Sequence, residues 1–237
     1  MILNLISSPR NISTAFMYSF AQRADTHVVD EPFYAYYLHQ TGIWHPGKEE
    51  TLASMPTDVA TVLQEIEQQA KTVDLLFLKN MAHHLIEMDI SFLTKMKNLF
   101  LIRNPKQLIA SFAQVIEQPT MQDIGAKRQQ ELYQYLIEAG EHPVVLDSGE
   151  LLKNPEKVLR QTCEALELPF FTEMLTWKAG ARFEDGAWAT YWYKNVHEST
   201  GFQQQKTSTR ALPAHCTELY EEAKPYYETL FEQAIKA

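Results

Sequence analysis

The sequence predicts an α/β protein: a three-layer sandwich in which helices cover both faces of a central, mostly parallel sheet of about five strands. Two observations predict this class. Short, continuously apolar runs recur along the chain, and segments whose apolar residues follow helical spacing separate them. Continuous apolarity indicates strands buried on both faces, and the alternation of such strands with helices is typical of α/β proteins.

Apolar runs predict the strands. Four runs show no regular alternation of apolar and polar residues, which a half-exposed strand would show. A fifth run, Val28-Val29, is shorter and predicts a weaker strand. The four runs are Ile2–Ile6, Leu75–Leu78, Leu99–Ile102 and Val144–Leu146.

Helices are predicted where apolar residues recur at intervals of three and four. Asn154-Pro155 predicts the start of a later helix, because proline suits the first helical turn. A last helix is predicted from about Pro213 to the end of the chain, with a kink at Pro225. The stretch from Trp177 to Phe202 shows neither the apolar spacing of a helix nor that of a strand, so we predict a long ordered loop. The earlier helices are predicted from apolar residues at this spacing within 59–66, 108–116 and 132–136.

Composition limits the class of protein. With 237 residues, of which 45% are hydrophobic and 22% charged, the chain is able to bury one core, and we predict a single domain over residues 1–237. The 21 Lys and Arg residues against 30 Asp and Glu residues give a net charge of −9. This charge argues against a sequence-independent nucleic-acid binder and against a protein held on anionic lipid.

The chain carries no pattern that points outside the cytoplasm. Cys163 and Cys216 lack CxxC spacing, so neither a disulfide framework nor a zinc site is indicated. The first apolar run is too short for a signal sequence, and no run approaches the roughly 18 residues of a membrane span. We therefore expect a cytoplasmic protein without a membrane or nucleic-acid partner, and the oligomeric state stays open.

A segment that binds anions is predicted at residues 7–14, between the first strand and the first helix. Free backbone N–H groups and the positive end of the helix dipole meet at such a connection. Arg10 adds a positive charge, and Ser13 and Thr14 add hydroxyl donors. The alternative is that Ser13 only caps the helix and that Arg10 is solvated. The segment is not GxxxxGK[ST], so the usual nucleoside-triphosphate loop is absent.

Residues 7–14 resemble the loop of sulfotransferases that use 3′-phosphoadenosine 5′-phosphosulfate (PAPS), a family with a P-loop NTPase-like fold. In that family a Pro-Lys/Arg pair, small residues and Ser/Thr surround the 5′-phosphosulfate. The resemblance places Arg10 at the family's basic position and Ser13-Thr14 at its hydroxyl pair, with Asn11 and Ile12 between them. Ile12 departs from the family, because many members have glycine there.

A second anion-binding segment follows the third long apolar run. Arg103 stands at the carboxyl end of the predicted strand, where open α/β sheets collect ligands, and Ser111 follows eight residues later. The pair resembles the sulfotransferase segment that binds the 3′-phosphate, with both residues at the family's spacing. The alternative is a surface arginine and a small packing serine.

The likeness extends from residue 1 to about 170. The stretch from Trp177 to Phe202 occupies the place of the family's loop that covers the nucleotide. Lys178, Arg182 and Lys194 there are candidates to add charge around the 3′-phosphate. Its aromatic residues are more typical of core than of a shelf for adenine.

Four residues are candidates for the catalytic step. Glu31 follows the weak strand, near the place where several sulfotransferase groups have a glutamate that acts as a base. The alternative is that Glu31 is a solvated carboxylate without a catalytic role. Arg10 is expected to stabilise the departing phosphate oxygen. Lys79 ends the Leu75 strand, and His83 follows it at a longer spacing than in the soluble sulfotransferases. Neighbouring His84 is an alternative base, because an ordinary imidazole accepts a proton near neutrality.

The prediction is a cytoplasmic sulfotransferase that moves the sulfuryl group of PAPS to a hydroxyl or amine of a small molecule, releasing adenosine 3′,5′-bisphosphate. No metal is expected, since no third ligand accompanies the two histidines. One alternative is a nucleoside-triphosphate-dependent kinase, because a predicted strand ends in Asp147 as magnesium-binding strands do. Another is a binding protein without turnover. The aromatic residues between Phe33 and Trp44 are candidates to line the acceptor pocket.

Overall fold

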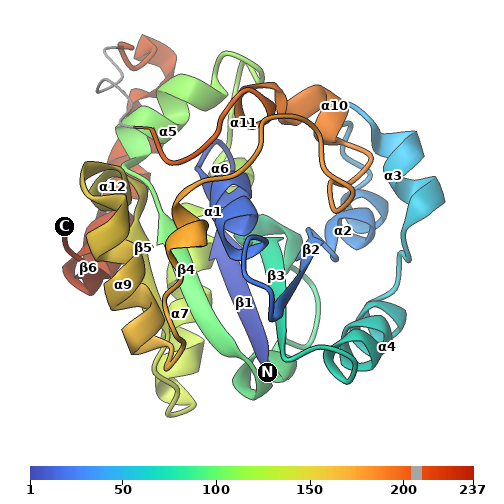
Figure 1. Cartoon of the computed structure of the whole chain (residues 1–237). Helices are drawn as coiled ribbons and strands as arrows, with labels where there is room; N and C mark the ends of the chain where they lie inside the picture. The colour runs from blue at the N-terminus through green and yellow to red at the C-terminus, as the bar shows by residue number, and fades with distance from the viewer. Residues whose placement is uncertain (204–209) are drawn as a thin grey trace.

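The chain forms a sheet of six parallel strands in the computed structural model, which describes residues 1–203 and 210–237. The strand order is β2-β3-β1-β4-β5-β6, so β1 lies near the middle (Figure 1). The strands are β1 Ile2–Ser7, β2 Thr26–Asp30, β3 Leu75–Met81, β4 Lys97–Ile102, β5 Val144–Asp147 and β6 Ala234–Ile235. The predicted α/β class with a parallel sheet is confirmed.

Helices connect the strands. The α-helices are α1 Ser13–Phe20, α2 Tyr34–Thr41, α3 Lys48–Ser54, α4 Val59–Ala70, α5 Pro105–Phe112, α6 Met121–Ile124, α7 Ala126–Glu138, α8 Ser148–Lys153, α9 Pro155–Ala165, α10 Ala189–Trp192, α11 Lys194–His197 and α12 Thr217–Glu232. Four short 3₁₀ helices are η1 Ala82–His84, η2 Ser91–Lys95, η3 Thr172–Leu175 and η4 Ala214–Cys216. Within the described ranges, no helix is long and apolar enough to cross a membrane.

Both faces of the sheet are buried, as continuous apolarity of the strands predicts. In β4, Leu99 and Leu101 belong to a core cluster that includes residues of α1 and α9. Phe100 and Ile102 belong to a second cluster, which includes residues of α4, α7 and α12. Successive side chains of one strand thus enter opposite layers, and helices on both faces complete the three-layer arrangement (Figure 1).

Several elements differ from the sequence-based prediction. The helix predicted to reach residue 116 ends at Phe112, and Val115 is exposed. The segment predicted as a loop, 177–202, contains the short helices α10 and α11. The last helix ends at Glu232, because the residues after it pair with β5 and form β6. A two-residue edge strand depends on its distant partner, so local periodicity did not reveal it.

The carboxyl ends of β1, β2, β3 and β4 lie together at one edge of the sheet. The register places Ser7 beside Met81 and Leu101, and Asp30 beside Lys79. The connections that follow these strands therefore start next to one another. Ligands of open α/β sheets bind at this edge.

Candidate active site

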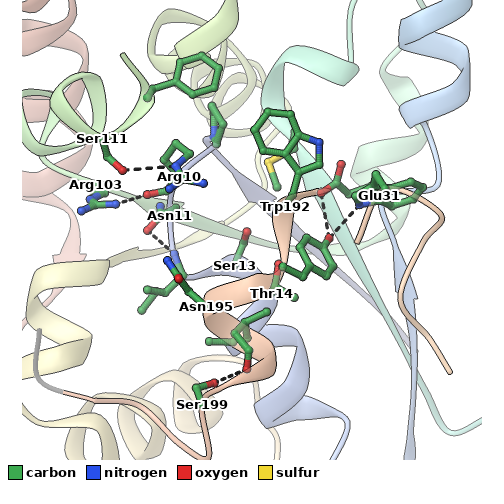
Figure 2. A pocket seen from close by; sticks show the side chains of 18 of the residues that line it. Arg10, Asn11, Ser13, Thr14, Glu31, Arg103, Ser111, Trp192, Asn195 and Ser199 are labelled. Carbon is green, nitrogen blue, oxygen red and sulfur yellow. Dashed lines mark hydrogen bonds between the residues drawn. The ribbon is translucent and has the colours of Figure 1, made fainter. Parts of the chain in front are cut away.

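A cavity of about 820 Å³ opens over this edge. The connection after β1 and the segment from Arg103 to Phe112 form one part of its wall, and residues of α10 and α11 form another. Small-molecule and cofactor sites occupy roughly 300–1,000 Å³, so the cavity has room for a nucleotide and part of a second ligand. Figure 2 shows Arg10, Arg103 and Ser111 gathered at one side of it and Glu31 at the other.

The connection after β1 enters α1 without a side-chain cap. α1 begins at Ser13, and Ile12 occupies the N-cap position, where no side chain accepts a hydrogen bond from the helix. The first backbone N–H groups of α1 therefore have no acceptor within the helix. Ser13 and Thr14 line the cavity, so these donors stand at its wall. The alternative in which Ser13 simply caps the helix is wrong.

Arg10, and not Ile12, takes the unusual backbone conformation of this connection. Its φ of 53° lies in the left-handed region, whereas Ile12 has a φ of −93°. The freedom of glycine is thus not needed at position 12, so the departure from the family pattern is compatible with the turn. Asn11 braces the turn, because its Nδ2 donates to the carbonyl of Leu101 at 3.0 Å and its Oδ1 accepts from the Ile12 N–H at 2.9 Å.

Three guanidinium groups face the same part of the cavity, which we call the arginine end (Arg10, Arg103, Ser111 and Arg210). Arg10 Nε donates to Ser111 Oγ at 3.3 Å, and Arg103 Nη1 donates to the carbonyl oxygen of Arg10. Burial and the charge of Arg210 lower the pKa of Arg10. Burial, Arg10 and Arg210 lower the pKa of Arg103, and the charge of Asp147 opposes this shift. Among the described residues, no carboxylate makes an ion pair with Arg10 or Arg103. Like charges held together in this way favour a bound anion.

Sequence reasoning missed Arg210. Arg210 lies beyond the stretch 177–202, in which we expected the loop that covers the nucleotide. It follows no predicted strand or motif that would mark it as a ligand-binding residue. The three candidates for this role do not line the cavity in the described part of the chain. Lys178 and Lys194 are exposed, and Arg182 makes an ion pair of 3.4 Å with Glu184 and lies over the ring of Tyr18.

Glu31 stands at the opposite side of the cavity. Its φ of 46° is left-handed, and its N–H donates to the carbonyl of Lys79 at 2.7 Å, which turns the chain sharply after β2. Glu31 Oε1 accepts from Lys79 Nζ at 2.6 Å, whereas Oε2 lies 3.8 Å from His84 Nδ1. Burial raises the pKa of Glu31, with Asp30 adding to the effect and Lys79 opposing it. The carboxylate is thus positioned and more basic than an exposed glutamate.

Lys79 lies behind the cavity wall. It is fully buried and does not line the cavity, and its Nζ donates to Asp30 Oδ1 at 2.6 Å as well as to Glu31. Nζ also donates to the Tyr193 hydroxyl at 2.5 Å, and that hydroxyl donates to Asp30 Oδ2 at 2.7 Å. Burial opposes the charge of Lys79, but Asp30 and Glu31 together raise its pKa. Lys79 therefore remains an ammonium group that fixes the two carboxylates.

His83 and His84 are neutral at neutral pH. Burial, followed by the charge of His45, lowers the pKa of His83 to about 3, and burial and the neighbouring histidines hold the pKa of His84 well below its ordinary value. Both line the cavity, and among the described residues neither Nδ1 has a hydrogen-bond partner. The ring of His84 stacks on Tyr34, with 4.6 Å between ring centroids and 6° between planes. Their environment favours neutral imidazole over an imidazolium.

We call the part of the cavity around Glu31 the glutamate end (Glu31, Tyr34, His45, His84, Trp188 and Trp192). Among the aromatic residues predicted between positions 33 and 44, only Tyr34 lines it within the described chain. Trp44 is exposed and does not line the cavity, and Tyr37 is packed in the core that joins α2 to α10. Trp188 and Trp192, from the segment predicted as a loop, supply the remaining large rings.

Asp147, the basis of the kinase alternative, caps a helix. Its Oδ1 accepts from the Glu150 N–H at 3.0 Å, and its Oδ2 accepts from the Tyr227 hydroxyl at 3.2 Å. Asp147 does not line the cavity, and β4 separates β5 from β1. Over the ranges that the structure covers, no group of three or more His, Cys, Asp or Glu residues has an arrangement suited to a metal ion.

The sequence pattern of the family described as "Sulfotransferase domain" matches residues 1–234, and the chain belongs to this family. Two solved structures share the fold. The "Sulfotransferase Domain from the Synechococcus PCC 7002 Olefin Synthase" has a TM-score of 0.56 and 16% identity and covers 93% of each chain. The "Sulfotransferase Domain from the Curacin Biosynthetic Pathway" has a TM-score of 0.50 and 13% identity and covers 97% of this chain and 90% of the other.

Two curated relatives from Arabidopsis thaliana are more similar in sequence. "Branched-chain-amino-acid aminotransferase-like protein 1" is 38% identical over 230 residues, and "Branched-chain-amino-acid aminotransferase-like protein 2" is 36% identical over the same length. Each match covers 97% of this chain but 41% of the relative. The chain thus spans less than half the length of these relatives.

Proposed function

We propose that this sulfotransferase-family chain transfers the sulfuryl group of PAPS to a hydroxyl or amine of a small molecule. The observation that carries the proposal is the shared cavity, in which Arg10 and Arg103 stand at one side and Glu31 at the other. Uncapped N–H groups at α1 fit a ligand with several negative charges. So do the guanidinium groups of Arg10 and Arg103, which make no ion pair with a carboxylate among the described residues.

The resemblance to the family and the geometry together suggest which residues would hold PAPS. In our proposal, Arg103 and Ser111 bind the 3′-phosphate. The 5′-phosphosulfate would lie against the connection after β1. The residues proposed there are Arg10, Asn11, Ile12, Ser13 and Thr14. When bound, PAPS supplies the sulfuryl group and a phosphate leaving group.

The chain's own residues would then move one proton and stabilise one charge. Glu31 Oε2 accepts the acceptor's proton, because Oε1 is already held by Lys79. Arg10 stabilises the negative charge that develops on the departing phosphate oxygen. Lys79 acts from behind the wall by fixing the Glu31 side chain, and the neutral His83 lines the cavity.

Other activities find less support. A kinase would need a magnesium ligand, and Asp147 is engaged in capping α8. The names of the Arabidopsis relatives mention aminotransferases, whose cofactor forms a Schiff base with a lysine. No lysine lines the cavity among the described residues. A binding protein without turnover has the same cavity, so activity has to be measured.

Thermal unfolding with ligands tests the nucleotide part of the proposal. We expect adenosine 3′,5′-bisphosphate to raise the melting temperature and Arg103→Ala to abolish the shift. The matched control is Arg160→Ala, because Arg160 pairs with Glu156 on the solvent-facing side of α9. A shift with Mg-ATP that equals or exceeds the bisphosphate shift would favour the kinase. Transfer of labelled sulfate across a panel of acceptors then separates an enzyme from a binding protein.

A further inference from the structure

Charge is divided between the two ends of the cavity. Arg10, Arg103 and Arg210 stand at the arginine end. Along the described wall, Glu31 is the one acidic residue, and the histidines beside it are neutral. An anionic acceptor would meet a carboxylate at the glutamate end without a cation on the wall there. The acceptor that fits this end is therefore uncharged or positive.

Within residues 1–203 and 210–237, the buried charges behind the glutamate end are not balanced. Asp30 and Glu31 are two carboxylates that share the single ammonium group of Lys79, and Tyr193 adds a neutral hydroxyl. Glu31 Oε1 accepts from Lys79, whereas no hydrogen bond to Oε2 occurs among the described residues. Buried carboxylates require a partner, so a cation against Oε2 would complete the cluster.

Aromatic rings line the same end of the cavity as Glu31. Trp188 meets Tyr34 edge-on at 5.0 Å, and Trp192 lies 6.2 Å from His45. Polar atoms of three of these rings are used internally: Tyr34 Oη is 2.8 Å from His45 Nδ1, and Trp188 Nε1 donates to the Tyr193 hydroxyl at 3.0 Å. The described wall thus offers aromatic surface, one carboxylate oxygen and the unpaired Nδ1 atoms of the neutral His83 and His84. Ammonium groups are bound by this combination of aromatic faces and negative charge.

We propose that the acceptor is an amine, whose nitrogen binds against Glu31 Oε2 between the rings of Tyr34, Trp188 and Trp192 and receives the sulfuryl group. This inference rests on the proposed function. It narrows the acceptor from hydroxyls and amines to amines, and it makes Trp188 and Trp192 residues that determine specificity.

The chemical step balances with Glu31 as the proton acceptor. The bound ammonium gives one proton to Glu31 Oε2, which releases it to water. The neutral nitrogen then forms the N–S bond, while the bond from sulfur to the phosphate oxygen breaks and leaves its electron pair on that oxygen. The second proton passes from nitrogen to Glu31. The products are a sulfamate and adenosine 3′,5′-bisphosphate.

Calorimetry with matched probes tests the inference. The protein is saturated with adenosine 3′,5′-bisphosphate and titrated at pH 7 with 2-phenylethylamine, its trimethylammonium analogue, 2-phenylethanol and phenylacetate. We expect the two cations to bind about tenfold or more tightly than the alcohol, and the carboxylate not to bind. Equal binding of amine and alcohol, or no binding of either, overturns the inference.

Two variants show where the preference arises. Glu31→Gln is expected to remove the preference for amine over alcohol. Trp192→Leu is expected to weaken binding of both cations several-fold, whereas the control Trp44→Leu, a tryptophan that is 72% exposed and outside the cavity, leaves it unchanged. A preference that survives Glu31→Gln contradicts the inference.

Failure of the inference is distinguishable from failure of the proposed function. If the bisphosphate does not bind, the proposed function is wrong. If the bisphosphate binds and labelled sulfate passes to alcohols as readily as to amines, the function stands and the amine inference falls. If the protein forms a sulfamate from 2-phenylethylamine and the Glu31→Gln variant does not, the result supports both the proposed function and the amine inference.

Discussion

The arginine end takes Arg10, Arg103 and Ser111 from two connections that each follow a strand, whereas the glutamate end joins segments far apart in the sequence. Arg10 and Arg103 both follow neighbouring strands, β1 and β4. At the other end, Tyr193 contacts Asp30 across 163 positions and Lys79 across 114. Apart from Arg210, the first end is thus assembled by connections that follow neighbouring strands, whereas the second depends on how the segment after residue 186 packs.

The two ends also differ in how their charged side chains are arranged. At the arginine end, like charges approach each other at a wall open to a ligand. Behind the glutamate end, the opposite charges of Lys79, Asp30 and Glu31 are buried and joined by short hydrogen bonds. We therefore expect ligand binding to depend mainly on the first end, and folding stability to depend on the second.

The largest effect is expected from Lys79→Met. The change leaves Asp30 and Glu31 buried without their cation, and breaking a buried ion pair in this way costs about 3–5 kcal/mol of unfolding free energy. Urea denaturation measures the loss. Lys97→Met is the matched control, because Lys97 pairs with Glu167 on the surface, where an ion pair contributes about 0–1 kcal/mol. Equal effects of the two variants would contradict the stabilising role of the glutamate end.

A smaller loss is expected from Tyr193→Phe. The Tyr193 hydroxyl accepts from Lys79 and Trp188 and donates to Asp30, so its removal leaves buried polar groups unsatisfied, at about 1–3 kcal/mol. The control Tyr191→Phe removes a hydroxyl that donates to Glu50 at the surface and is expected to change little. Urea denaturation of both variants checks the difference. An unchanged unfolding free energy in Tyr193→Phe would mean that packing, and not this hydroxyl, holds the segment after residue 186 in place.

The contrast between the ends explains how much the sequence predicted. Strands and their following residues are local features, so the α/β class and the positions of Arg10 and Arg103 were accessible from apolar runs and motif spacing. Glu31 was found because it too follows a strand. Its role remains a proposal, as do the roles of Lys79 and His83.

Contacts between residues that meet only through tertiary packing could not be predicted from the sequence. Nothing in the sequence around Tyr193 or Trp188 indicates that they reach this edge of the sheet, since Tyr193 bonds to Lys79 and Asp30 and Trp188 packs on Tyr34, all more than a hundred positions away. Arg210 likewise approaches Arg10 through the path of the chain and not through a motif. Lys79, a candidate for the catalytic step, lies behind the wall, because Asp30, Glu31 and Tyr193 hold its Nζ there.

The raised pKa of Glu31 predicts the pH dependence of transfer. A base must be deprotonated, so kcat/KM is expected to fall about tenfold per pH unit below the pKa of Glu31, in a limb centred above pH 4.5. The pKa of His83, about 3, lies too low to produce this limb. Rate profiles of Glu31→Asp and His83→Gln are the measurement. The limb should move in the first variant and keep its midpoint in the second; the reverse pattern would assign the proton to the histidine.

The smallest effect is expected from Ser111→Ala at the arginine end. Ser111 accepts from Arg10 Nε at 3.3 Å and, in our proposal, donates to the 3′-phosphate. One hydrogen bond contributes about 0.5–1.5 kcal/mol, so adenosine 3′,5′-bisphosphate should bind roughly two- to tenfold more weakly while the protein keeps its unfolding free energy. Calorimetric titration checks the affinity, with Ser91→Ala, an exposed serine bonded to Asp89, as control. Weaker folding with unchanged affinity would make Ser111 a packing residue and would remove the distinction between an end that binds and an end that stabilises.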